Sequence, residues 1–178
     1  MNYRKISKCR ICKSGKIKKV LDLGDQAFTG KFPTSYKKNI SKSPLSISLC
    51  LKCKFVQLSH NFSSSYLYNQ EYGYESGINS TMKNHLFKIA QKVVELKKLT
   101  KSSIVVDIAS NDGTLLNSYN KDIIKVGIDP ILDKFKDKYQ KINHKVSDFF
   151  SYKNFKKLNL KKKSRCYYSF CSFLWCRE

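Results

Sequence analysis

The chain has few residues that interrupt regular structure and few acidic ones, with 7 Gly, 3 Pro and 13 Asp+Glu among 178 residues. It has no apolar run near the roughly 18 residues that a membrane-spanning helix needs, and its first residues lack the apolar stretch of a signal peptide. A hydrophobic content of 41% allows a buried core and excludes a wholly disordered basic tail. We therefore expect a cytoplasmic protein with no membrane partner, in which paired cysteines more often bind a metal than form disulfides.

Positive charge, in contrast, is abundant, because 35 Lys+Arg give a formal net charge of +22. The positive residues are nearly all Lys, and Arg occurs only at Arg4, Arg10, Arg165 and Arg177. Arg is the side chain that recognises phosphate and guanine in a bidentate manner, so its scarcity makes nucleic acid an unfavoured partner without excluding it. A solvated Lys-rich surface and an anionic partner both remain open, and a nucleotide-sugar would satisfy the second as well as RNA would.

Two Cys-x-x-Cys pairs near the N-terminus, separated by a long insert, predict a metal site made of Cys9, Cys12, Cys50 and Cys53. Each pair presents two thiolates from one tight turn, and two such turns complete a tetrahedral shell for zinc. A disulfide pair or an iron–sulfur cluster is the alternative. Since cysteine fills all four positions, we expect a structural zinc that a small module of short strands needs in order to fold.

A tyrosine-rich segment and a helical pattern follow this module. Residues 62–78 are irregular, and from residue 80 apolar side chains recur at helical spacing, with Asn79 or the next residue as the expected N-cap. We expect this helix to pack between two domains. Tyr72 and Tyr74 are either packing tyrosines or residues that line the mouth of a pocket.

Strand and helix patterns then alternate from residue 101 onward. Apolar runs at 103–109 and 123–128, a short one near Val146, and helical patterns between them predict a β-α-β-α-β order, the first half of a doubly wound parallel sheet. Ligands of such sheets bind at the carboxyl ends of the strands. Asp129 ends the second strand, where a carboxylate can accept hydrogen bonds from both ribose hydroxyls of a nucleoside, although a plain Asp-Pro turn is the alternative. The absence of GxGxxG and GxxxxGK[ST] loops argues against NAD and ATP.

The order of these motifs resembles a known family, the zinc-containing, S-adenosylmethionine-dependent sugar C-methyltransferases, which act on nucleotide-linked keto-deoxysugars in deoxysugar biosynthesis. The similarity covers about residues 8–150 and rests on the four cysteines, Val56-Gln57-Leu58, Tyr72-Gly-Tyr-Glu-Ser-Gly77 with His85, Ser110-Asn-Asp-Gly-Thr-Leu-Leu116 and Gly127-Ile-Asp-Pro130. It implies an α/β fold: a four-cysteine zinc knuckle with short antiparallel strands, a helical linker, and the first half of a class I methyltransferase (Rossmann-like) sheet.

The resemblance also implies a mechanism and the residues that take part in it. A base removes the proton next to the sugar's keto group, and the enolate attacks the methyl group of the cofactor. Asp107 and the loop of Ala109, Ser110, Asn111, Asp112 and Gly113 would hold the methionine end, Asp129 the ribose, Asp148 and Phe149 the adenine edge, and Tyr72 or Tyr74 the sugar side. The chain departs from the family at Ala109, where Gly is usual, and no residue here matches the family's general base.

The C-terminal residues 164–178 differ in composition from the rest, because they contain three of the seven Cys and the only Trp. One reading is a buried fourth strand. The other is a frameshift, because permitted codons read one nucleotide later encode Ala-Asp-Val-Ile-Thr-Ala-Phe-Ala-Val-Phe, an apolar run suited to a parallel strand.

We accordingly expect four regions: a zinc-binding domain at 1–62, a Tyr-rich segment and linker helix at 63–100, a partial S-adenosylmethionine-binding domain at 101–163, and an out-of-frame tail at 164–178. The leading functional hypothesis is a truncated sugar C-methyltransferase that is inactive alone. The alternatives are a basic zinc-knuckle module that binds RNA, and a methyltransferase of another substrate class.

Overall fold

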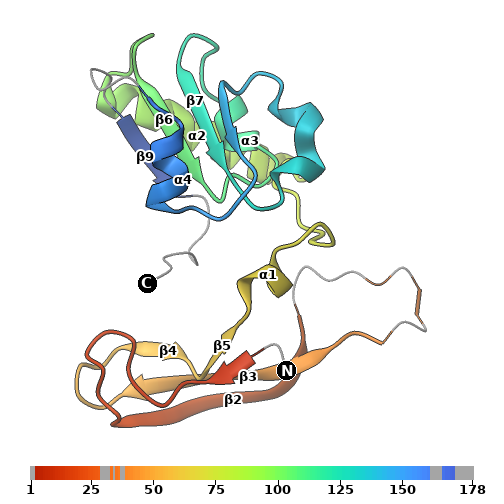
Figure 1. Ribbon diagram of the computed structural model, residues 1–178, viewed down its shortest axis with the longest axis vertical. Coiled ribbons are helices and arrows are strands. Elements are labelled where there is room, and N and C mark those ends of the chain that lie inside the picture. Colours follow the sequence, from red (N-terminus) through yellow and green to blue (C-terminus); the bar gives the residue numbers. More distant parts are fainter. Residues whose placement is uncertain (1–2, 29–32, 34, 37–38, 161–165, 171–178) are drawn as a thin grey trace. The chain divides into compact units, whose positions relative to one another are not determined.

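The chain forms two compact units, Met1–Gly73 and Tyr74–Glu178. The computed structural model describes residues 3–28, 33, 35–36 and 39–160, and the backbone of 166–170 (Figure 1). Within these residues, no helix combines the length and the apolar character that crossing a membrane requires.

The first unit is built from short antiparallel strands. A three-stranded sheet has the order β2-β3-β4, with β2 at Ile17–Ala27, β3 at Lys42–Cys50 and β4 at Val56–Leu58. A separate two-stranded antiparallel sheet pairs β1 (Tyr3–Lys5) with β5 (His60–Phe62), and the short helix α1 (Ser64–Leu67) follows. The alternating pattern of the sequence therefore predicts strands where strands occur.

The side of β3 that is buried is its serine side. Ser46 and Ser48 are buried, whereas Ile47 between them is only half-buried. The reason is a set of polar contacts on that side: the Ser48 and Ser59 hydroxyls lie 2.6 Å apart, and the Ser59 N–H donates to the Ser46 carbonyl. Polar pairing across this face thus takes the place of apolar packing.

The second unit contains a parallel sheet of the order β8-β7-β6-β9. Its strands are β6 (Ile104–Ile108), β7 (Ile124–Ile128), β8 (His144–Val146) and β9 (Cys166–Phe170). The chain runs outward from β6 through β7 to β8 and then returns to the other side of β6, so the strand order reverses beside β6. Strands buried on both faces are typically rich in Val and Ile. β6 is Ile-Val-Val-Asp-Ile and β7 is Ile-Lys-Val-Gly-Ile, so each also contains one charged residue, Asp107 or Lys125, and both of these are buried.

Helices cover both faces of this sheet (Figure 1). Three residues of α4 (Tyr152–Lys157) and its C-terminal extension, Phe155, Leu158 and Leu160, pack on the core of Ile104, Val106, Ile108, Val126 and Ile128. The opposite face meets α3 (Thr114–Asn117) and the 3₁₀ segment η1 (Leu132–Tyr139), which is kinked at Phe135 where the sequence pattern suggests a regular helix. It is this opposite face that bears the polar residues of the strands.

The long helix α2 (Ser80–Lys97) begins as predicted at Asn79, whose side chain accepts hydrogen bonds from the N–H groups of the next turn. Its buried residues are Leu86 and Ala90, while Leu96, which the spacing places on the same apolar face, is 67% exposed. The packing surface is therefore shorter than the periodic pattern indicates.

The C-terminal strand β9 lies parallel to β6, with Cys166 opposite Ile104 and Phe170 opposite Ile108. A fourth strand is thus present at 166–170, as one of the two readings expects. The remainder of the tail lies outside the described residues, and the frameshift stays a prediction about the nucleotide sequence.

Candidate metal centre and cofactor loop

The two Cys-x-x-Cys turns adopt the same backbone conformation. In each, the N–H group four residues after the first cysteine donates to that cysteine's carbonyl, from Lys13 to Cys9 at 3.0 Å and from Lys54 to Cys50 at 2.9 Å. Both lysines are left-handed, with φ values of 58° and 63°. Each first cysteine also donates its own N–H to the carbonyl five residues onward. The two turns are therefore a matched pair of knuckles that present their thiols in the same way.

The knuckles bring four thiols into one cluster. The Sγ atoms of Cys9, Cys12, Cys50 and Cys53 all lie within 4.8 Å of one another. Cys9 Sγ is 3.5 Å from Cys53 Sγ, and Cys12 Sγ is 3.6 Å from Cys50 Sγ. A tetrahedral zinc with Zn–S bonds of about 2.3 Å places its sulfur atoms about 3.8 Å apart, so the cluster fits this metal. All four cysteines are free thiols rather than disulfides.

The electrostatics of the cluster also favour a cation. The backbone N–H of Cys53 lowers the pKa of the Cys50 thiol to about 6. The N–H of Phe55 favours a thiolate at Cys53, but burial and the neighbouring thiols outweigh it and raise the pKa of Cys53 to about 12. Without a cation, repulsion between neighbouring thiolates opposes ionisation of all four cysteines at once. A bound divalent cation offsets this repulsion and favours the four thiolates.

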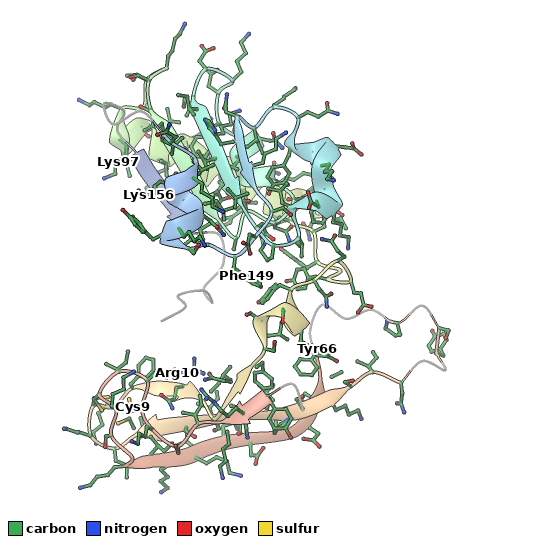
Figure 2. The ribbon with its side chains drawn as sticks, viewed as in Figure 1. Cys9, Arg10, Tyr66, Lys97, Phe149 and Lys156 are labelled. Atoms are coloured by element: carbon green, nitrogen blue, oxygen red, sulfur yellow. The ribbon has the colours of Figure 1, made fainter. Side chains whose placement is uncertain are left out.

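A buried glutamine of β4 forms hydrogen bonds with the backbone of the first Cys-x-x-Cys turn and of the residue before it. Gln57, in the middle of β4, accepts from the Arg10 N–H at 2.9 Å and donates to the Lys8 carbonyl at 3.3 Å. Arg10 lies next to Cys9 in the first unit (Figure 2), and its guanidinium bonds Asn61. The sequence pattern marks Gln57 only as part of a strand, and its role in holding the knuckle becomes visible only in the fold.

The loop that follows β6 has an unusual backbone. Ala109, Asn111 and Gly113 have φ values of 61°, 49° and 75°, so left-handed residues alternate along it. The Ala109 N–H donates to the carbonyl of Ile128, the last residue of β7, at 2.9 Å. The loop is thus held against the end of the neighbouring strand.

Asp129 directly follows β7 and is tied to this loop. Its Oδ2 accepts from the Asn111 N–H at 2.8 Å, and its Oδ1 accepts from the Ile131 N–H at 2.9 Å. Burial raises the pKa of the carboxyl above its usual range, although these two N–H groups act in the opposite direction. Each carboxylate oxygen still has a lone pair, so the group can accept hydroxyl donors as well.

Tyr139 holds the loop through its hydroxyl, a role that the sequence alone does not reveal. Its fully buried hydroxyl lies 2.7 Å from the Ser110 hydroxyl and donates to the Asn111 carbonyl at 2.8 Å. Its ring contacts Gly127 so closely that a Cβ there would lie 2.7 Å from Tyr139 Cε1. Burial raises the pKa of Tyr139, so the phenol stays protonated as a donor. The sequence predicts only that Tyr139 lies in a helical segment, and it does not predict these contacts.

The other predicted cofactor residues lie at the same edge of the sheet, because the carboxyl ends of parallel strands meet there. Asp107 is fully buried near the end of β6, opposite Gly127 of β7. Asp148 and Phe149 follow β8. Asp148 is exposed and accepts from the Asn154 side chain, and Phe149 lies at this edge of the second unit (Figure 2).

The two predicted substrate-side tyrosines have different surroundings. Tyr74 is 44% exposed, and its carbonyl accepts from the Asn111 side chain at 3.1 Å. Tyr72 belongs to the first unit, where its ring packs against Tyr68 with a centroid distance of 5.1 Å. The structure therefore joins Tyr74 to the loop at 109–113 through the side chain of Asn111.

Comparison with known proteins bears on the first unit. A family model named Methyltransf_13 and described as a "Putative zinc binding domain" matches residues 9–68, 60 of the 178 residues. No curated protein matches the chain. The match includes all four clustered cysteines. The N-terminal unit is therefore similar to a methyltransferase-associated zinc-binding domain and carries the four-cysteine site expected of one.

Proposed function

We propose that this chain is the N-terminal part of an S-adenosylmethionine-dependent C-methyltransferase that acts on a nucleotide-linked keto-deoxysugar. The observation that carries the proposal is the pairing of Asp129 with the loop at 109–113, at the carboxyl ends of β6 and β7. In doubly wound sheets this is where a nucleoside binds, and the strand order reverses beside β6. The similarity of the first unit to a methyltransferase-associated zinc domain supports the same class of enzyme.

The roles follow from the chemistry of each group. Asp129 would accept the two ribose hydroxyls, and the Asn111 and Ile131 N–H groups would keep its carboxylate in one orientation. The backbone of the 109–113 loop would approach the methionine end, because its small residues leave room. Asp148 and Phe149 would contact the adenine, and Tyr74 would face the sugar.

The zinc would have a structural role, since four cysteine ligands leave no open position for a substrate. The bound cofactor supplies the electrophilic methyl group. The proton next to the keto group must leave to a base, and no residue of this sequence matches the family's base. We therefore propose that the 178-residue chain binds the cofactor without catalysing methyl transfer by itself.

The test is a calorimetric titration of the zinc-loaded full chain with S-adenosylmethionine. We expect saturable binding to the wild type, weakened about tenfold to a hundredfold by Asp129→Asn, because a hydrogen bond to a charged acceptor contributes about 1.5–3 kcal/mol. Asp133→Asn is the matched control, since Asp133 is an exposed aspartate four residues away that forms an ion pair with Lys136. The absence of binding to the wild type would refute the proposal.

A basic surface on α4 favours RNA binding as the second candidate. The exposed side chain of Tyr152 and the side chains of Lys153, Lys156 and Lys157 line a shallow hollow of about 420 Å³. Stacking on an aromatic ring beside Lys is how single strands bind without sequence preference. Salt-dependent binding of a single-stranded RNA together with no cofactor binding would favour this function.

A further inference from the structure

Four consecutive residues, Tyr74–Gly77, are each held by a polar contact within the second unit. Asn111 Nδ2 donates to the Tyr74 carbonyl, and Asn111 Oδ1 accepts from the Ser76 N–H at 3.0 Å and from the Ser76 hydroxyl at 3.3 Å. Asp112 Oδ2 accepts from the Gly77 N–H at 2.8 Å. Glu75 forms an ion pair with Lys138 of η1. The side chains of Asn111 and Asp112 are thus engaged with this segment.

The approach of the segment to the loop is close enough to require glycine. A Cβ on Gly77 would lie 2.6 Å from both Asp112 Oδ2 and Thr114 Oγ1, far inside van der Waals contact. The carboxylate cannot easily withdraw, because Asp112 is 1% exposed and its Oδ1 already accepts from the Thr114 hydroxyl at 2.7 Å. The contact is therefore a specific, tightly fitted one.

The same loop residue connects this segment to the carboxylate after β7. Asn111 uses its side chain for Tyr74 and Ser76, its N–H for Asp129 and its carbonyl for the Tyr139 hydroxyl. Its left-handed φ of 49° directs the backbone and the side chain to these separate partners. If Asp129 moves, Asn111 should move with it and so change the position of Tyr74, because Asn111 is bonded to both residues.

We propose that Asn111 and Asp112 are positioning residues that clamp the segment Tyr74–Gly77 to the 109–113 loop and so couple ligand binding at Asp129 to the placement of Tyr74. The ligand class is a nucleoside whose ribose hydroxyls bond the carboxylate, and this identity rests on the proposed function. The clamp itself does not depend on that identity. The side chains of Asn111 and Asp112 do not contact the ligand in this proposal; they affect its binding site only by holding the segment Tyr74–Gly77.

The first experiment measures amide hydrogen exchange by NMR at Ser76 and Gly77 in the ligand-free full chain. Asn111→Gly removes the side chain and keeps the left-handed backbone accessible. We expect exchange at Ser76 to accelerate at least tenfold. The matched control is Asn159→Gly, since Asn159 is an exposed asparagine with a similar φ of 46°. Unchanged exchange in Asn111→Gly, or equal acceleration in both variants, overturns the clamp.

Gly77→Ala provides a second variant if Asn111→Gly does not fold. It leaves both clamping side chains in place but displaces the segment, so exchange at Ser76 should again accelerate at least tenfold while the amides of β6 and β7 keep their wild-type rates. Wild-type exchange at Ser76 in this variant would contradict the clamp.

The second experiment adds S-adenosylmethionine and repeats the measurement. We expect the cofactor to slow exchange at Ser76 and Gly77 in the wild type and in Asn159→Gly. We expect no slowing in Asn111→Gly. A contact that only stabilises the fold would not make exchange at these amides depend on the cofactor. If the wild type binds the cofactor without this response, the coupling is wrong. If it does not bind the cofactor at all, the proposed function fails, and the ligand-free exchange rates still decide whether the clamp exists.

Discussion

The two units bury different kinds of side chain. Among the described residues of Met1–Gly73, the buried residues counted as hydrophobic are Cys9 and Cys50, and the other buried side chains are Ser and Gln. The second unit buries Ile, Val, Leu and Tyr side chains on both faces of a parallel sheet. A small unit without an apolar core needs another source of folding free energy, and a structural metal is one. We therefore expect a metal at the four cysteines to stabilise the first unit as apolar packing stabilises the second.

The largest effect should come from removing the metal from the first unit. A structural zinc supplies about 10 kcal/mol or more in small zinc domains. We expect Cys50→Ser, or chelation, to unfold β2 and β3 while the amides of β6 and β7 stay protected in NMR hydrogen exchange. Lys52→Ala is the control, because Lys52 lies between the cysteines of the second pair without being a ligand. If the β2–β3 ladder stays protected without zinc, the first unit does not depend on the metal for its stability, and the proposed difference between the units is wrong.

A smaller effect, confined to the second unit, is expected from Gly127→Ala. The new Cβ would meet Tyr139 Cε1 at 2.7 Å and Leu116 Cδ1 at 3.1 Å, and the ring is fixed by the two hydrogen bonds of its hydroxyl. Overpacking of this kind costs about 1–3 kcal/mol of unfolding free energy, which urea denaturation can measure.

The matching change in the first unit is Gly15→Ala, whose Cβ would have no atom within 4 Å. We expect it to alter stability by less than about 0.5 kcal/mol. A loss of bound zinc in Gly127→Ala, or equal destabilisation by both substitutions, would mean that the units do not respond separately.

The carboxyl of Asp129 should make the second unit more stable as the pH falls. The folded pKa of Asp129 is raised by burial, so between the unfolded pKa and the folded pKa the native state binds the extra proton. Its contribution to the unfolding free energy is then fully present below the unfolded pKa and is lost as the pH rises through the folded pKa, with a slope of at most about 1.4 kcal/mol per pH unit. The measurement compares unfolding free energies of the wild type and Asp129→Asn across this window. Parallel pH profiles would show that Asp129 is not the group responsible.

A small effect of the opposite sign, a gain in stability, should come from Ala109→Gly. Ala109 has a φ of 61°, which costs a non-glycine residue about 1–2 kcal/mol, while glycine loses about 0.4–1 kcal/mol through the greater freedom of the unfolded chain. We therefore expect the unfolding free energy of the second unit, measured by urea denaturation, to rise by about 0.5 kcal/mol. A loss of stability would show that the loop makes use of the alanine methyl group.

The predictions made from sequence succeeded where the signal is local. The spacing of Cys9, Cys12, Cys50 and Cys53 predicts one metal cluster, and the structure brings their Sγ atoms within 4.8 Å. The Val/Ile runs and the cap at Asn79 also predict elements that are present. These features depend on neighbouring residues along the chain, so a single sequence suffices to find them.

The failures lie where burial and long-range contacts decide. The alternation in β3 does not reveal that its serine side is the buried one, because that choice depends on Ser59 eleven residues later. The roles of Gln57 and Tyr139 were not predicted, since their partners lie far away in the sequence. That the side chains of Asn111 and Asp112 bond Ser76 and Gly77 was likewise not predicted, while a role of this loop at the cofactor stays a prediction.

The sequence by itself determined the metal-binding cysteines, the strand and helix order, and the acidic residue at the end of the second parallel strand. Only the tertiary structure decided which faces are buried, that the Tyr74 carbonyl is bonded to the loop, and which groups the loop's polar side chains contact. The physical reason is that local spacing controls turns and strands, whereas the partner of a hydrogen bond or the fit around a glycine depends on atoms brought together by folding.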